Sequence, residues 1–149
     1  MPQARILIVE DESIVAQDVR VCLEQMGYGV LGVVPTGEQA LVEVEADNPD
    51  LVLMDIVLAG NLNGIQAADR IRQKWGIPVV YLTAHSDGDT LADAGITEPF
   101  GYILKPFGER ELKTVIEMAL YRAKAEDERR RAEADLQKER DFSSAILGT

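Results

Sequence analysis

The chain has little of several residue types, and each scarcity excludes a class of protein. Its 149 residues include one cysteine, so an internal disulfide is excluded, and the place of Cys22 in a helical pattern favours a buried structural thiol in a reducing compartment. No apolar run approaches the length of a membrane span, and the first residues lack the layout of a signal peptide. We therefore expect a soluble, cytoplasmic protein without a membrane partner.

Histidine and positive charge are also scarce. The only histidine, His85, does not form a recognisable triad pattern with a serine or cysteine nucleophile, so we interpret it as a rim residue. The formal net charge is -11, and since residues 122–149 carry as many basic as acidic groups, residues 1–121 hold the whole acidic excess. An acidic globular part argues against direct nucleic-acid binding, because phosphate contacts need basic patches.

What is abundant is an alternation of short apolar runs with segments of helical periodicity. Nearly continuous apolar runs are typical of strands buried on both faces of a sheet, and apolar residues spaced three and four apart are typical of helices. The predicted strands are 4–10, 28–34, 51–55, 78–83 and 101–104. The predicted helices are 12–26, one capped by Thr36, 65–75, 85–94 and a longer one after residue 108. Their order predicts an α/β fold with a five-stranded parallel sheet and helices on both faces.

The region after residue 108 has a different pattern. From Glu109 to about Ile146 the sequence contains no glycine or proline, and an apolar stripe that is clear up to Tyr121 thins out among mixed charges beyond it. A helix over this whole segment would span roughly 55 Å at about 1.5 Å per residue, more than a small α/β domain can cover. We therefore expect a domain over residues 1–121 and a charged, coiled-coil-like helical extension over residues 122–149.

Polar residues with related chemistry follow four of the five predicted strands. Glu10 and Asp11 follow the first, Asp55 the third, Thr83 the fourth and Lys105 the fifth. In an open parallel sheet the carboxyl ends of the strands meet at one edge, where ligands bind. Three carboxylates, a hydroxyl and an ammonium gathered there suit a divalent cation and a phosphoryl group.

Each of these residues has an ordinary interpretation beside the chemical one. Asp55 at a strand end is suited to attack phosphorus, yet an aspartate there often caps a helix or turn. Glu10 and Asp11 would repel each other and Asp55 unless a cation such as Mg²⁺, which prefers oxygen ligands, relieved them. Lys105 after an apolar run either reaches solvent or meets an anion. Pro106 allows a cis peptide bond in a tight turn, which would direct Lys105 into the crevice.

Four segments together resemble a known family. ILIVED, LVLMD, VVYLTA and GYILKPF, in this order and spacing, resemble the receiver domain of two-component response regulators over roughly residues 4–121. The resemblance implies a flavodoxin-like receiver fold with strand order 2-1-3-4-5 and an extended last helix. It also implies that Asp55 is the phosphoacceptor and that Thr83 and Lys105 hold the phosphoryl oxygens.

The same resemblance implies a metal site and a switch. Mg²⁺ would be held by the carboxylates of Glu10, Asp11 and Asp55 and by the backbone carbonyl of Val57. Thr83 and Tyr102 would be the switch residues, and the Lys105–Pro106 peptide would be cis. The sequence departs from the usual pattern in having Glu10 where aspartate is commoner, and in a loop after Asp55 that is one residue longer, with Ala59 in place of a proline.

The function implied is that of a phosphoacceptor in a two-component phosphorelay. A histidine kinase or phosphotransfer protein would donate the phosphoryl group, and the face built from the fourth helix, fifth strand and last helix would switch. Such a domain is not a conventional enzyme, since it catalyses only its own phosphorylation and dephosphorylation. The alternatives are a non-phosphorylated, receiver-like interaction or dimerisation module, a phosphatase with an aspartate nucleophile, and a flavodoxin-like cofactor binder. Val57 stands where such a phosphatase needs a second acid, and Glu10 and Asp11 would repel a cofactor phosphate.

The charged extension carries a second, separate resemblance. Residues 119–147 are similar to the connecting helix that leads into a sensory PAS domain in multidomain sensor kinases. This implies a further PAS or kinase-type domain, as in a hybrid sensor kinase, and a homodimer formed through the C-terminal helix.

Overall fold

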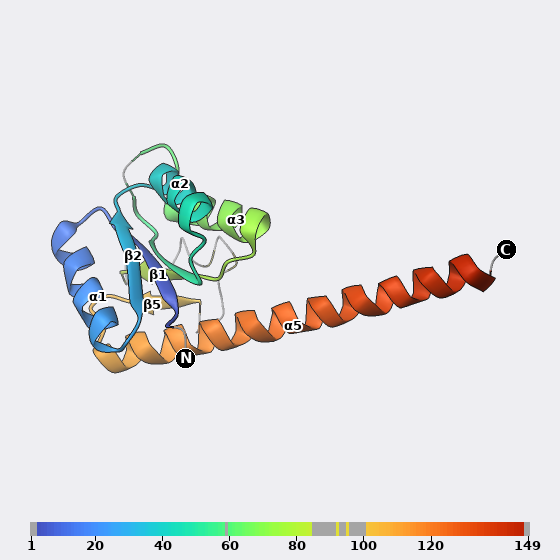
Figure 1. Ribbon diagram of the computed structural model, residues 1–149. Coiled ribbons are helices and arrows are strands. Elements are labelled where there is room, and N and C mark those ends of the chain that lie inside the picture. Colours follow the sequence, from blue (N-terminus) through green and yellow to red (C-terminus); the bar gives the residue numbers. More distant parts are fainter. Residues whose placement is uncertain (1–2, 59, 85–91, 93–94, 96–100, 148–149) are drawn as a thin grey trace.

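The protein folds as five parallel strands between layers of helices. The computed structural model describes residues 3–58, 60–84, 92, 95 and 101–147. The elements are β1 Arg5–Val9, α1 Ser13–Gln25, β2 Gly29–Val34, α2 Gly37–Asp47, β3 Leu51–Asp55, α3 Gly64–Trp75, β4 Val79–Thr83, β5 Tyr102–Leu104 and α5 Glu109–Leu147. The strand order is β2-β1-β3-β4-β5, and every neighbouring pair is parallel (Figure 1). The predicted fold is confirmed, while the predicted helix 85–94 lies almost wholly outside the described residues.

Local signals in the sequence fix where the helices begin and end. Thr36 caps α2, its hydroxyl accepting a hydrogen bond from the backbone N–H of Gln39 at 3.2 Å, as predicted. Asn63 and Gln66 form a reciprocal capping box at the start of α3. Gly76 ends α3 in the left-handed region with φ 68°, where glycine is favoured. These caps place the loops between strands and helices, which carry the polar residues.

Two apolar layers hold the sheet between the helices. On one face the side chains of β1, β3 and β4 pack against α2 and α3; on the other they pack against α1 and the start of α5 (Figure 1). Within β1 the two faces alternate, since Leu7 and Val9 belong to the first layer and Ile6 and Ile8 to the second. Cys22, expected to be buried, is only partly buried at the edge of the second layer, because it lies toward the solvent side of α1.

The last helix is buried against the sheet only over its first turns. Leu112 and Ile116 are fully buried against the sheet, whereas Tyr121 has 72 % of its surface exposed and Leu136 49 %. Beyond Tyr121 the helix runs past the domain as a single rod (Figure 1). The predicted extension of the last helix is confirmed.

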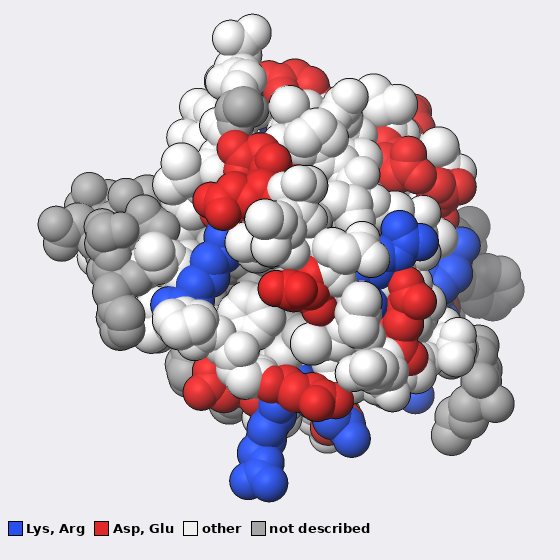
Figure 2. Space-filling model, turned by 90° about the vertical axis from the view of Figure 1, so that its left-hand side faces the viewer, with Lys and Arg blue, Asp and Glu red and all other residues white. Residues whose placement is uncertain are grey.

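The acidic composition of the chain is visible on its surface. On the face drawn in Figure 2, acidic side chains form several separate patches. Over the part of the chain that the structure describes, no helix combines the length and apolar character needed to cross a membrane.

Candidate functional site

The parallel sheet brings the ends of β1, β3, β4 and β5 to one edge. Val9 of β1 pairs with Met54 of β3, so the next residues, Glu10 and Asp55, stand at neighbouring strand ends. Across β4 and β5 the backbone N–H of Lys105 donates to the carbonyl oxygen of Thr83 at 2.7 Å. All of the polar residues predicted to converge therefore lie at this edge, as expected for a parallel sheet.

Three carboxylates form a cluster at this edge. Glu10, Asp11 and Asp55 each offer an oxygen atom, and these atoms all lie within 4.8 Å of one another. Asp11 is exposed, but Glu10 and Asp55 expose only 2 % and 5 % of their surface. Such close acids repel each other when ionised, and burial removes the water that would screen them.

Burial and repulsion shift the pKa values of the two buried acids. Burial, and next the charge of Asp55, raises the pKa of Glu10 from 4.5 to about 7, although a hydrogen bond from Lys105 opposes the shift. Burial also raises the pKa of Asp55, against hydrogen bonding with Glu10 and the charge of Lys105. Without a further cation, Glu10 and Asp55 therefore keep their protons to higher pH than ordinary carboxylates do.

Lys105 lies between the two buried acids. Its Nζ atom is 3.1 Å from Oε2 of Glu10 and 3.5 Å from Oδ2 of Asp55. Burial alone would lower the pKa of this ammonium, but the hydrogen bond to Glu10 and the charge of Asp55 raise it. One ammonium cannot balance three carboxylates, so the site keeps a net negative charge that suits a divalent cation with oxygen ligands.

Hydrogen bonds fix the two buried carboxylates in place. Oδ1 of Asp55 accepts from the backbone N–H of Val57 at 3.2 Å, and Oε1 of Glu10 accepts from that of Glu12 at 3.2 Å. The Val57 side chain is 61 % exposed. Val57 thus follows Asp55 in a tight turn at the site.

Thr83 and Tyr102, the predicted switch residues, lie at the ends of the pair β4 and β5. Thr83 is fully buried, and its hydroxyl donates to the carbonyl oxygen of Ala84 at 3.2 Å. Tyr102 is partly buried against the layer formed with α2 and α3, and it pairs with Tyr81 of β4. The Lys105–Pro106 peptide bond is cis. His85 lies outside the described residues.

Sequence reasoning missed Glu38, a residue that shapes the loop after Asp55. Its Oε1 atom accepts from the backbone N–H groups of Asn61 at 2.9 Å and Leu62 at 2.8 Å. Hydrogen bonds from its own backbone and from Leu62 lower the pKa of this carboxyl, whose side chain is partly buried. In the sequence Glu38 is only an acid in the first turn of a helix, so no local pattern marks this contact.

Gly64 was also missed as a residue of the site. A Cβ atom at this position would overlap the backbone carbonyl oxygen of Asp55 and approach Cα of Ile56 to 2.9 Å. The first residue of α3 must therefore be glycine for the loop to close against β3. The only signal in the sequence is the turn-rich composition of residues 60–64.

Comparison with known proteins agrees with this geometry. The family model of the response regulator receiver domain matches residues 6–117. The chain belongs to the response regulator receiver domain family. Its acidic cluster and lysine stand at the same sheet edge that the sequence resemblance indicated. The protein is thus a component of two-component signalling, with a receiver domain over most of its length.

Curated relatives share the receiver domain but are longer. The transcriptional regulatory protein PdtaR of Mycobacterium tuberculosis is 36 % identical over 118 residues, which cover 79 % of this chain and 57 % of PdtaR. The phyllosphere-induced regulator PhyR of Methylorubrum extorquens is 33 % identical over 117 residues, which cover 78 % of this chain and 43 % of PhyR. The chain therefore spans about half the length of these relatives.

Two solved structures of receiver domains match this chain over nearly their whole length. The signal receiver domain of a modulated diguanylate cyclase from Desulfovibrio desulfuricans G20 is 38 % identical with a TM-score of 0.77, over 84 % of this chain and 99 % of that one. The N-terminal domain of a response regulator/sensory box/GGDEF three-domain protein from Carboxydothermus hydrogenoformans is 38 % identical with a TM-score of 0.73, over 82 % and 98 %. Both are similar to this receiver in fold and sequence.

Proposed function

We propose that this receiver domain accepts a phosphoryl group on Asp55, with Mg²⁺ as cofactor and a histidine kinase or phosphotransfer protein as donor. The observation that carries the proposal is the position of Lys105, whose ammonium lies 3.5 Å from Asp55 while two further carboxylates stand within 4.8 Å. A buried aspartate held beside an ammonium and an acidic pair suits a carboxylate nucleophile rather than a helix cap.

The transfer step follows from these positions. An ionised Asp55 oxygen forms a bond to phosphorus while the bond from phosphorus to the donor histidine nitrogen breaks, and the electron pair stays on that nitrogen. The hydrogen bond from the Val57 backbone N–H to Oδ1 leaves Oδ2 as the oxygen nearer to Lys105. Lys105 can then follow the charge that develops on the phosphoryl oxygens, so that positioning and electrostatics supply the catalysis.

The donor set fits Mg²⁺. Glu10, Asp11 and Asp55 would hold it together with the carbonyl of Val57, since Mg²⁺ prefers oxygen ligands and keeps several waters. When bound, the ion neutralises charge on the carboxylates and on the phosphoryl oxygens. Relief of the repulsion between Glu10 and Asp55 would leave Asp55 ionised at neutral pH, which a nucleophile requires.

Phosphorylation would change the rest of the domain through Thr83 and Tyr102. A phosphoryl group carries about two negative charges, which would attract the hydroxyl of Thr83 and give Tyr102 room to turn inward. Tyr102 lies in β5, which precedes α5, so its movement would repack the face that β5 and the start of α5 form and shift an existing equilibrium.

We further propose that α5 passes this shift to a partner. The exposed Tyr121 and Leu136 suit pairing with a second copy of the helix, and the mixed charges of residues 122–149 suit a connecting helix in the cytoplasm. The similar receivers described as parts of a cyclase and of a sensory-box protein support a further sensory or cyclase-type domain after this helix.

Labelling by a small phosphodonor tests the acceptor directly. With acetyl phosphate and Mg²⁺, the wild-type chain should gain one phosphoryl group by intact-mass spectrometry, and Asp55→Asn should gain none. Asp18→Asn, which removes an exposed carboxylate from α1, is the matched control and should be labelled like wild type. Equal labelling of Asp55→Asn would refute the acceptor assignment. A wild-type chain that binds Mg²⁺ but is never labelled, even by a histidine kinase, would favour the non-phosphorylated interaction module.

A further inference from the structure

A second concave site lies at the opposite edge of the sheet. It is a groove with a cavity volume of about 330 Å³ between the end of α3, the first residues of β4 and the middle of α5. β4 runs from Val79 at this groove to Thr83 at the acidic edge, so the two sites are about 13–17 Å apart, the length of a strand. The phosphoacceptor chemistry therefore makes no use of this groove.

The walls of the groove are strongly basic. They contain Arg72 from α3 and Arg122, Arg129 and Arg130 from α5, against one acid, Glu126. These four arginines are more than a quarter of the 15 basic residues in a chain with a net charge of -11. A concentration of positive charge on an otherwise acidic protein makes a local field that attracts anions.

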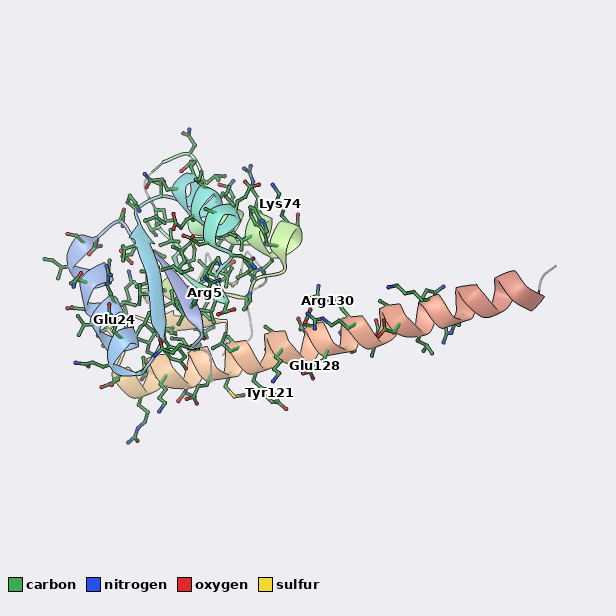
Figure 3. The ribbon with its side chains drawn as sticks, in the orientation of Figure 1. Arg5, Glu24, Lys74, Tyr121, Glu128 and Arg130 are labelled. Carbon is green, nitrogen blue, oxygen red and sulfur yellow. The ribbon has the colours of Figure 1, made fainter. Side chains whose placement is uncertain are left out.

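Two of these arginines are held in place from opposite walls. Arg72 donates to the hydroxyl of the buried Tyr81 at 2.7 Å and to Asp69 at 3.2 Å. Arg130 projects from α5 on the side that faces the domain, whereas Tyr121 and Glu128 project from the other side (Figure 3). Its guanidinium lies 3.7 Å from the place of a Cβ on Gly76, so it spans the groove to the end of α3.

The helix dipole explains only part of this arrangement. The carbonyl end of α3 carries a partial negative charge that favours a nearby cation. The last turn of α3 already contains Arg72 and Lys74, which provide that cation. Arg129 and Arg130 therefore add positive charge beyond what the helix end needs. Arg130 also lies 3.9 Å from a carboxylate oxygen of Asp127, and the remaining basic excess of the groove favours binding of an anion.

The floor of the groove is apolar. Ile77, Pro78 and Val79 line it from the domain, and Ala119 and Ala123 line it from α5. A volume of about 330 Å³ is at the lower end of the range of small-molecule sites, which combine apolar walls with a few polar groups. Guanidinium groups bind phosphate through paired hydrogen bonds and also stack on planar rings.

We propose that this groove binds a small organic phosphate of nucleoside monophosphate type, with its phosphate on the arginines and its ring system against the apolar floor. The ligand would contact both α5 and the domain, and would stabilise the docked direction of the long helix. This inference does not depend on phosphorylation of Asp55.

Calorimetric titration of the 149-residue chain at low ionic strength tests the proposal. The probes are AMP, GMP, inorganic phosphate and adenosine. We expect saturable one-to-one binding of AMP or GMP, weaker binding of phosphate and no binding of adenosine. The double variant Arg129→Gln/Arg130→Gln should lose at least about tenfold in affinity, because charge-assisted hydrogen bonds are removed. Asp55→Asn should bind like wild type, which separates this test from that of the acceptor.

A charge-matched control keeps the result specific. Lys113→Gln/Arg140→Gln also removes two positive charges from exposed positions of the same helix, and neither residue lines the groove, so it should bind like wild type. Circular dichroism and thermal melting would establish that the double variant is folded. Absence of saturable binding of both nucleotides, equal binding of inorganic phosphate and AMP, or an equal loss in Lys113→Gln/Arg140→Gln would each overturn the proposal.

Discussion

The ammonium of Lys105 lies 3.1 Å from a carboxylate oxygen of Glu10, although β3 and β4 separate the strands that these two residues follow. Lys105 reaches across them because its side chain is long, and it passes Asp55 at 3.5 Å on the way. The lysine therefore couples the two buried acids of the site. Removing it should change both of them.

The variant Lys105→Met tests this coupling. It keeps a long apolar stem but removes the charge, so the ammonium no longer opposes the effects of burial and mutual repulsion on Glu10 and Asp55. We expect the pKa of Glu10 in metal-free protein to rise above the wild-type value of about 7. Carboxyl carbon shifts measured by NMR over a pH series report this directly. Lys113→Met, an exposed site on α5, should leave the pKa of Glu10 unchanged.

The raised pKa of Glu10 predicts an unusual dependence of stability on pH. Between about 4.5, its value when unfolded, and about 7, its value when folded, the folded protein binds more protons than the unfolded chain. The free energy of unfolding in EDTA should therefore fall as pH rises through this window. Affinity for Mg²⁺ should rise over the same window, because the ion competes with the proton.

Urea unfolding at several pH values, with and without Mg²⁺, measures both effects. In metal-free protein, Glu10→Gln should remove most of the decrease in the free energy of unfolding with rising pH. The raised pKa of Asp55 should cause the remaining decrease, since it has the same sign. An unchanged slope in Glu10→Gln would show that Glu10 titrates normally.

Gly64 should not tolerate a side chain. In Gly64→Ala the new methyl group would overlap the carbonyl oxygen of Asp55, so the loop must move. We expect a loss of about 1–3 kcal/mol in the free energy of unfolding, typical of overpacking, and slower labelling of Asp55. Gly32→Ala is the matched control, since a methyl group there meets nothing within 4 Å. It should be neutral or stabilising by up to about 1 kcal/mol. Equal losses in both variants would contradict the close approach of Gly64 to β3.

Glu38 should protect the loop after Asp55 from opening. In Glu38→Ala the amides of Asn61 and Leu62 lose their acceptor, so their hydrogen exchange should become faster. Glu38→Gln keeps a carbonyl acceptor and should have a smaller effect. Because hydrogen bonds lower the pKa of Glu38, its stabilising effect should be present above its unfolded value of 4.5 and be lost as pH falls through the lower folded value. Exchange that is equally fast in wild type would show that the contact does not hold the loop.

The charged site could be predicted from the sequence because its residues lie at the ends of strands. Glu10, Asp55 and Lys105 each follow an apolar run, and parallel topology places such positions together without knowledge of any side-chain contact. The Glu38 contact joins segments more than 20 residues apart through a helix cap and a loop, so no periodicity marks it. The basic groove escaped prediction for a similar reason, since it exists only where α5 passes the end of α3.

The free part of α5 has a mechanical consequence. From residue 131 to residue 147 the helix extends about 25 Å beyond the groove that it forms with α3, at about 1.5 Å per residue. A rigid helix of that length converts a tilt of about 5° at its base into a displacement of about 2 Å at its tip. Leu112 and Ile116 are the buried residues at the base of this helix. A sub-ångström change in their packing thus becomes a larger movement at the end of the helix, which can separate or align the groups attached there.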